Sequence, residues 1–242
     1  MSKPKSSLGL VGLHQYSGKL DAHSAATGMQ AARLNAADLI ATSQLLFDSQ
    51  KFSHSVAFSI LAIEETAKVS IILNIFLEVG DLKDMWKGFR SHTYKGSFLN
   101  PALASVAKST FPEIDEETLK TIAEGPRPED LDAHKQLGFY TDCFQSPDGP
   151  AWHLPKSLNA TRTTARMWLG EAKALVNQLR DYPPEELEVR YKHAHHYDRK
   201  TKGELLTATK ALRDELTEKG FIKAGSWDSI VKELERQANL DS

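Results

Sequence analysis

Cysteine is almost absent from this chain, because only Cys143 occurs among its 242 residues. A single cysteine forms no disulfide within the chain and cannot supply the several thiolates of a cysteine-based zinc site. Such scarcity suits the reducing cytosol, so we expect a cytoplasmic protein. We interpret Cys143 as a small, half-buried residue rather than a nucleophile.

An excess of charge of one sign is also lacking. The 30 Lys and Arg residues nearly balance the 32 Asp and Glu residues, which leaves a formal net charge of -2. This balance excludes the global basic field that marks constitutive nucleic-acid binders. Any contact with RNA must therefore be local.

Long apolar runs are missing as well. The stretch LGLVGL near the N-terminus is too short for the apolar part of a signal peptide. Between Val69 and Leu77, the apolar run is interrupted by Ser70 and Asn74, so it is too polar and too short for a membrane span. We expect no contact with a membrane.

Apolar residues at helical spacing are plentiful, and alternation typical of strands is not evident. The first two helices are joined by a short turn, which predicts an antiparallel helical hairpin. The fold class is therefore predicted to be all-α. The expected helices cover about residues 22–49, 53–78, 82–94, 101–109, 116–123, 157–179, 203–219 and 227–238.

The chain is expected to divide into three parts. Residues 1–20 are rich in Gly and Ser and suggest a flexible arm. Residues 21–182 form the helical bundle, whose segments EGPRPEDL and HKQLGFYTDCFQSPDGPAWHLP are interpreted as loops. A Tyr-Pro-Pro stop at 182–184 ends the bundle, and residues 183–242 follow as a charged helical extension.

The second expected helix contains the stretch AIEETAK, which places charge in an otherwise apolar element. Lys68 lies four residues after Glu64 and three after Glu65, so it can reach either carboxylate on one helix face. An isolated buried charge costs several kcal/mol, whereas a paired one is tolerated. The pair either fixes the packing of the hairpin or belongs to a functional site, and the residues alone leave both open.

Candidate partners for these carboxylates lie in the stretch WKGFRSHTYK. Arg90, His92 and Lys95 stand close together there and could face the acids of the second helix. A lone histidine is more often structural or solvated than catalytic. Two cations beside it favour a functional interpretation.

The run LNAADLIATSQLLFDSQKFSHSVAFSILAIEETAK resembles the abortive-infection V (AbiV) family of bacterial anti-phage proteins. The stretches FRSHTYK and GFYTD resemble that family's Phe-Arg-x-His-x-x-Lys and Leu-Tyr-Val-Asp elements, and Gly149 and Pro155 follow them. The resemblance covers about residues 25–180, with Ala67 where a glycine is usual and Phe139 where a leucine is usual. It implies a HEPN-like helical bundle and a role in abortive infection.

Many HEPN proteins are metal-independent ribonucleases that act as dimers. The resemblance therefore implies a possible RNA substrate, a homodimer, and neither a metal nor another cofactor. His92 would act as acid and base, Arg90 and Lys95 would contact the phosphate, and Glu64 or Glu65, neutralised by Lys68, would orient the imidazole. The alternative is a non-catalytic defence protein that binds a phage protein or RNA.

A literal Arg-x4-His pattern, typical of HEPN ribonucleases, occurs later, from Arg190 to His195. The pattern is weak because it arises by chance in many chains. The segment is interpreted either as a solvated basic stretch or as a binding site for RNA or a phage protein. Histidines at 193, 195 and 196 without a cysteine are poor evidence for zinc.

Three further residues complete the candidate set. By the family match, Tyr140 and Asp142 lie over the mouth of the bundle, near the charged patch. Each has an ordinary structural alternative, as a packing aromatic and as a turn or cap residue. Asn35 at the start of the resemblance is a binding candidate with the same two interpretations.

Overall fold

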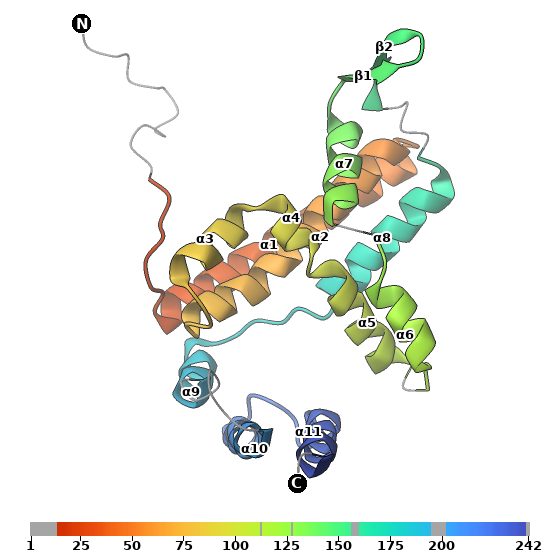
Figure 1. Ribbon diagram of the computed structural model, residues 1–242. Coiled ribbons are helices and arrows are strands. Elements are labelled where there is room, and N and C mark those ends of the chain that lie inside the picture. The colour runs from red at the N-terminus through yellow and green to blue at the C-terminus, as the bar shows by residue number, and fades with distance from the viewer. Residues whose placement is uncertain (1–13, 112, 127, 156–159, 195–201, 241–242) are drawn as a thin grey trace, which may run out of the picture.

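The computed structural model describes residues 14–111, 113–126, 128–155, 160–194 and 202–240 (Figure 1). Helices dominate these residues, which confirms the predicted all-α class. Two long helices, α1 (Ala22–Asp48) and α2 (Phe52–Phe76), lie side by side as the predicted hairpin. Five further helices of the described part of the chain pack on this hairpin.

The start of α1 and its contact with α2 follow from local chemistry. Asp21 caps α1, since its carboxylate accepts the N–H of Ser24 at 2.6 Å. Between the helices, the buried hydroxyl of Ser43 lies 3.0 Å from that of Ser55 and 2.8 Å from that of Ser59. Small hydroxyl residues that bond one another let the two backbones approach without leaving polar atoms unpaired.

α2 is the central helix of the bundle. It packs against α1 on one side, and against α7 (Pro128–Phe139) and α8 (Arg162–Val176) on the others. Residues around its whole circumference are buried, as expected for a helix surrounded by neighbours. Trp168 and Leu169 of α8 close the main core against it.

The third expected helix is not continuous. It divides at Ser91 into α3 (Leu82–Arg90) and α4 (His92–Gly96). The hydroxyl of Ser91 accepts the N–H of Tyr94 at 3.2 Å and caps the new helix. The prediction of one helix over residues 82–94 was therefore wrong, and the break changes the direction in which His92 leaves the backbone.

α5 (Leu99–Thr110) and α6 (Glu116–Ala123) follow at the places expected from the sequence. The prediction of loops for EGPRPEDL and HKQLGFYTDCFQSPDGPAWHLP was wrong in part. α7 runs from the first of these segments into the second, and a hairpin of β1 (Asp142–Ser146) and β2 (Gly149–His153) follows it. This antiparallel hairpin projects beyond α7 (Figure 1). Cys143 lies on it and is exposed, not half-buried as expected.

A close backbone approach explains the position of α7. A Cβ added to Gly138 would lie 2.7 Å from the Cβ of Ala57 and 2.9 Å from the carbonyl oxygen of Ser53. Only glycine permits α7 to pack so closely on α2. Leu131, one further core residue of α7, is 3% exposed.

The C-terminal part consists of α9 (Pro184–Ala194), α10 (Lys202–Glu218) and α11 (Asp228–Leu240). α9 was not predicted, but its first residue is the second proline of the expected stop, a favoured position at the start of a helix. Val189, Leu212 and Leu216 form a small core of their own here. The division of the chain at residue 182 stays a prediction.

Glu215 of α10 joins that helix to α9. Its carboxylate lies 2.7 Å from the ammonium of Lys192 and 2.8 Å from Nε2 of His193. The hydrogen bond from Lys192, followed by that from His193, lowers the pKa of Glu215 from 4.5 to about 2. This contact therefore stabilises the folded state fully above about pH 4.5, and the stabilisation is lost as the pH falls toward 2.

We expect Glu215→Gln to remove part of this acid sensitivity. In thermal unfolding followed by circular dichroism between about pH 5 and about pH 3, the melting temperature of the wild-type protein should fall further than that of the variant. Glu188→Gln, an exposed carboxylate of α9, is the matched control and should follow the wild type. If the melting temperature of Glu215→Gln falls as far as that of the wild type, the Glu215 contact is not a source of the acid sensitivity.

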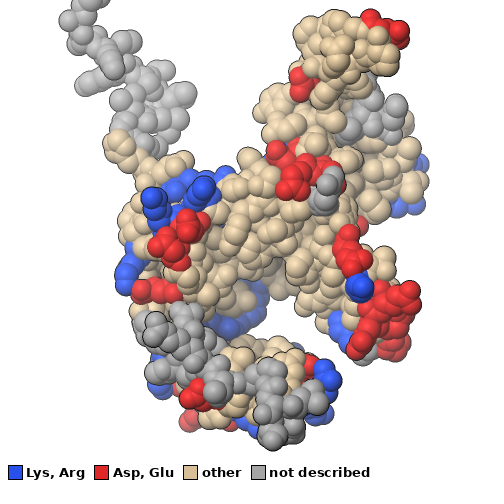
Figure 2. Space-filling model, in the orientation of Figure 1, with Lys and Arg blue, Asp and Glu red and all other residues tan. Residues whose placement is uncertain are grey.

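The surface carries no broad basic field on the face drawn in Figure 2, where basic and acidic side chains lie in small separate groups. None of the helices in the described ranges is both long and apolar enough to cross a bilayer. Residues 14–20 lie along α3: Trp86 donates its indole N–H to the carbonyl of Gly18 at 2.9 Å. Within the described part of the expected arm, the chain is thus in contact with the bundle.

Candidate functional site

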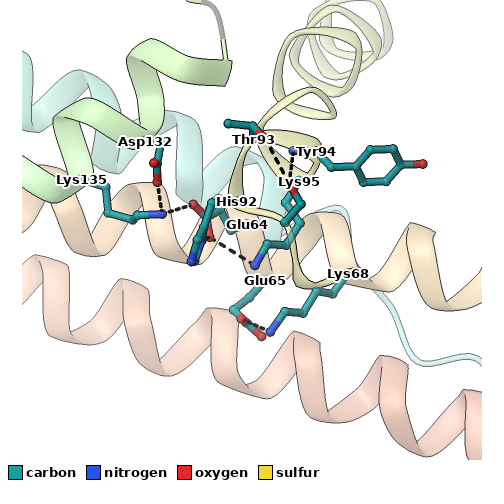
Figure 3. A network of polar contacts seen from close by, with 10 residues as sticks. Glu64, Glu65, Lys68, His92, Thr93, Tyr94, Lys95, Asp132 and Lys135 are labelled. Carbon is teal, nitrogen blue, oxygen red and sulfur yellow. Dashed lines mark hydrogen bonds and ion pairs between the residues drawn. The ribbon is translucent and has the colours of Figure 1, made fainter. Parts of the chain in front are cut away.

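A buried carboxylate, Glu64 of α2, is the centre of a polar cluster (Figure 3). Its side chain is 5% exposed. Nδ1 of His92 lies 2.5 Å from Oε2, and the ammonium of Lys95 lies 3.4 Å from the same oxygen. The ammonium of Lys135 lies 2.7 Å from Oε1. Three proton-bearing groups from two other helices therefore converge on one acid.

The helix break at Ser91 and the packing of α4 on α7 position these partners. His92 is the first residue of α4 and Lys95 lies one turn later, so both face α2. A Cβ on Gly96 would lie 3.3 Å from Cα of Pro128, at the start of α7. This contact holds α7 so that Lys135 reaches Glu64 from the opposite side to Lys95 (Figure 3).

His92 and Glu64 form a carboxylate–imidazole pair. The ring is bound through Nδ1, while the His92 side chain as a whole remains 48% exposed. A carboxylate that accepts the Nδ1 proton fixes the ring and leaves Nε2 as a proton acceptor. The pair can therefore accept a proton from a molecule in solvent and stabilise the resulting imidazolium.

Lys95 and Lys135 are almost completely buried, with side chains 6% and 4% exposed. Burial lowers the pKa of Lys95 and outweighs the opposing attraction of Glu64. For Asp132, burial acts to raise the pKa, but the hydrogen bond and charge of Lys135 prevail and leave the pKa of that carboxyl below its usual value. The two lysines thus depend on Glu64 and Asp132 as counter-charges.

Glu64, His92 and Asp132 also place ligand-type atoms within 4.8 Å of one another, close enough to share a metal ion. The ammonium of Lys135, however, lies 2.7 Å from both carboxylates. A cation already stands where a metal would be held, so these three residues fit a metal only if Lys135 withdraws.

The second acid of the motif faces elsewhere. Glu65 pairs with Lys68, and the ammonium of Lys68 also lies 5.3 Å from the ring centre of Phe89. Lys68 therefore neutralises Glu65 rather than Glu64. Asn35 of α1 lines the same hollow as this pair, so the structure brings Asn35, Glu65 and Lys68 together beside the Glu64 cluster.

Arg90 does not point at the carboxylates. Its guanidinium donates to the carbonyl of Tyr16 at 2.5 Å and lies 5.5 Å from the ring of Trp86. It holds the segment that precedes α1 against α3. Its expected contact with a phosphate is therefore not favoured by this arrangement.

Tyr140 and Asp142 lie past the end of α7, where the β-hairpin starts. Tyr140 is 63% exposed. The carboxylate of Asp142 accepts the N–H of Cys143 at 2.7 Å. Within the described ranges, no ion pair or hydrogen bond joins either side chain to Glu64, so the cluster forms without them.

Arg190 is half-buried rather than solvated. Its guanidinium binds the fully buried carboxylate of Glu186 at 2.7 Å and lies over the rings of Tyr182 and Trp227. The ring contacts join α9 to Tyr182, just before this helix, and to Trp227, just before α11. The other end of the Arg-x4-His pattern, His195, lies outside the described residues.

Lys135 and Asp132 are the two members of the cluster that the sequence analysis missed. They come from a stretch interpreted as a loop, and Lys135 lies 71 residues from Glu64 along the chain. One signal was present: Asp132 and Lys135 are three residues apart, the spacing of an ion pair on one helix face. Recognising that spacing depended on recognising α7.

Comparison with known proteins gives one match. The family model HEPN_AbiV, described as AbiV, matches residues 24–177, which is more than half of the chain. The matched range holds nearly all of α1, all of α2 to α8 and the Glu64 cluster. It also holds all but one of the residues that line the hollow beside the cluster. No curated protein and no solved structure matches the chain.

Proposed function

The chain belongs to the AbiV family of HEPN-type abortive-infection defence proteins, and we propose that its Glu64–His92 pair cleaves RNA without a metal ion. The observation that carries this proposal is the imidazole bound through Nδ1 by a buried carboxylate while its side chain stays half exposed. The same arrangement prepares histidines for general acid–base work elsewhere.

In the proposed reaction, Nε2 of His92 takes the proton of a ribose 2′-hydroxyl. The 2′-oxygen bonds to the adjacent phosphorus, the bond from phosphorus to the 5′-oxygen breaks, and the leaving oxygen takes a proton from water. The hydroxide that remains takes the proton from the imidazolium and restores the neutral ring. Glu64 stabilises the imidazolium that forms. Lys95 and Lys135 hold the Glu64 carboxylate in place against the imidazole, and no step of the reaction uses a metal ion.

The experiment is an RNA digestion in the presence of a chelator. With excess EDTA, purified protein should convert single-stranded RNA into products with a 2′,3′-cyclic phosphate and a 5′-hydroxyl, identified by mass spectrometry. A matched oligonucleotide with one 2′-deoxyribose should resist cleavage at that nucleotide, because the nucleophile is missing. Cleavage that stops with EDTA and returns with Mg²⁺ would contradict the proposal.

The second candidate is a non-catalytic defence protein that binds a phage protein or RNA. The full neutralisation of Glu64 by two buried lysines favours it, since an ion network of this kind also serves to hold helices in register. This candidate predicts a stable complex recovered from infected cells and no turnover of RNA. Recovery of no phage component, with RNA turnover in EDTA, would exclude it.

A further inference from the structure

A hollow of about 410 Å³ lies beside the Glu64–His92 pair, between α1, α2 and α3. This volume falls within the range of ligand pockets, which is about 300–1,000 Å³. Its walls are largely apolar and include Ile72, Trp86 and Phe89. The small residues of α1 on its other side, Gly28 and Ala31, leave space for a flat ligand.

Polar side chains also line this hollow, among them Glu65, Lys68 and Asn35. Glu65 and Lys68 are 14% and 22% exposed and pair with each other. Within the described ranges, this pair is the one hydrogen bond that either side chain makes. It uses one of about four lone-pair sites on the carboxylate, so both oxygens of Glu65 can still accept a hydrogen bond, and two ammonium protons of Lys68 remain for a ligand. Asn35 adds an amide from α1.

We propose that the hollow binds a guanine base of the RNA substrate, an inference that rests on the proposed function. Guanine presents two N–H donors, N1–H and the N2 amino group, side by side, and these match the carboxylate of Glu65. Its O6, next to N1, accepts from the ammonium of Lys68. Adenine and cytosine carry one exocyclic amino donor beside an acceptor, and uracil carries one N–H between two acceptors, so they match the carboxylate less well.

The hollow and the pair are close enough to act on one strand of RNA. Glu64 and Glu65 are consecutive residues of α2, so their side chains project about 100° apart. Glu64 faces α4 and α7, and Glu65 faces α1 (Figure 3). Phe89 of the hollow lies three residues before His92. We infer that a base held in the hollow leaves the neighbouring phosphate within reach of the imidazole.

Nucleotide binding, measured without RNA cleavage, tests the proposed guanine site. Guanosine 5′-monophosphate should bind the wild-type protein and His92→Gln with the same affinity in isothermal titration calorimetry. Inosine 5′-monophosphate, which lacks only the N2 amino group, should bind about 10-fold more weakly, because it forms one of the two hydrogen bonds to Glu65. Glu65→Gln should weaken guanosine monophosphate binding by about 10- to 100-fold.

One control and one further variant complete the binding experiment. Glu188→Gln, the same change on α9, should bind as the wild type does. Ala31→Leu, an exposed position of α1 at the rim of the hollow, should block binding without altering the Glu65–Lys68 pair. Equal binding of guanosine and inosine monophosphates, or binding unchanged in Glu65→Gln and Ala31→Leu, overturns the proposal.

The two proposals fail in different ways. Cleavage in EDTA without preference for guanine beside the scissile phosphate would overturn the guanine site and leave the nuclease proposal standing. Guanine-selective binding that Glu65→Gln abolishes would support the site even if no RNA is cut.

Discussion

Glu64→Gln should lower the free energy of unfolding by about 3–5 kcal/mol, the largest stability effect that we expect of any single polar substitution in this protein. The change keeps the shape of the side chain but removes its charge. Lys95 and Lys135, whose side chains are 6% and 4% exposed, then lose their shared acid. Lys135 keeps Asp132, whereas Lys95 keeps the weaker attraction of Glu65. Leaving buried ammonium groups without a counter-charge is costly, because they have lost their hydration and gain little in return.

Urea unfolding followed by circular dichroism measures this effect. The matched control is Glu65→Gln, the same change one residue later, in a pair whose members are 14% and 22% exposed. We expect it to cost no more than about 1 kcal/mol, since solvent can still reach Lys68. Equal losses in the two variants would show that the Glu64 cluster is no more important for stability than the pair beside it.

The bundle could be predicted from the sequence where local pattern and packing agree. α1 and α2 begin and end within about two residues of the expected positions, because a long apolar period, Asp21 as a cap and a short turn all indicate the same helices. The break at Ser91 could not be predicted in this way. A serine within a helical pattern either caps a new helix or points to solvent, and only the packing of α4 on α7 decides between them.

The candidate site could be predicted in part for a related reason. Glu64 lies on a long apolar helix in which a charge is conspicuous. His92 and Lys95 stand together in one short stretch that could face the acids, so these three residues were predicted to meet. Lys135 lies on α7, whose segment carries prolines before it and Gly138 inside it, both typical of loops. The glycine is required there by the close approach to α2, a tertiary contact that no local pattern reports.

The same distinction applies to Arg90. Its place between Phe89 and His92 suggested a partner for the acids, yet α3 turns it toward the carbonyl of Tyr16. Sequence spacing limits which side chains can meet on one helix. The direction of each helix relative to its neighbours determines which of them do meet.

His92→Gln should have the largest effect on activity, with RNA cleavage reduced by about 10²- to 10⁴-fold. Glutamine can still donate a hydrogen bond to Glu64, but it cannot accept and hold a proton. Because the His92 side chain is 48% exposed and the buried ions remain paired, we expect a change of no more than about 1 kcal/mol in the free energy of unfolding. The variant should therefore be folded and inactive.

Initial rates of RNA cleavage and a phage plaque assay measure the two consequences. His23→Gln, an exposed histidine of α1, is the control and should retain both cleavage and protection. Loss of cleavage in His92→Gln with protection intact would show that defence does not act through this reaction, and full cleavage would exclude His92 as the base. Together with Glu64→Gln, which should lose stability as well as activity, the variant separates catalysis by the cluster from its role in holding α2, α4 and α7 together.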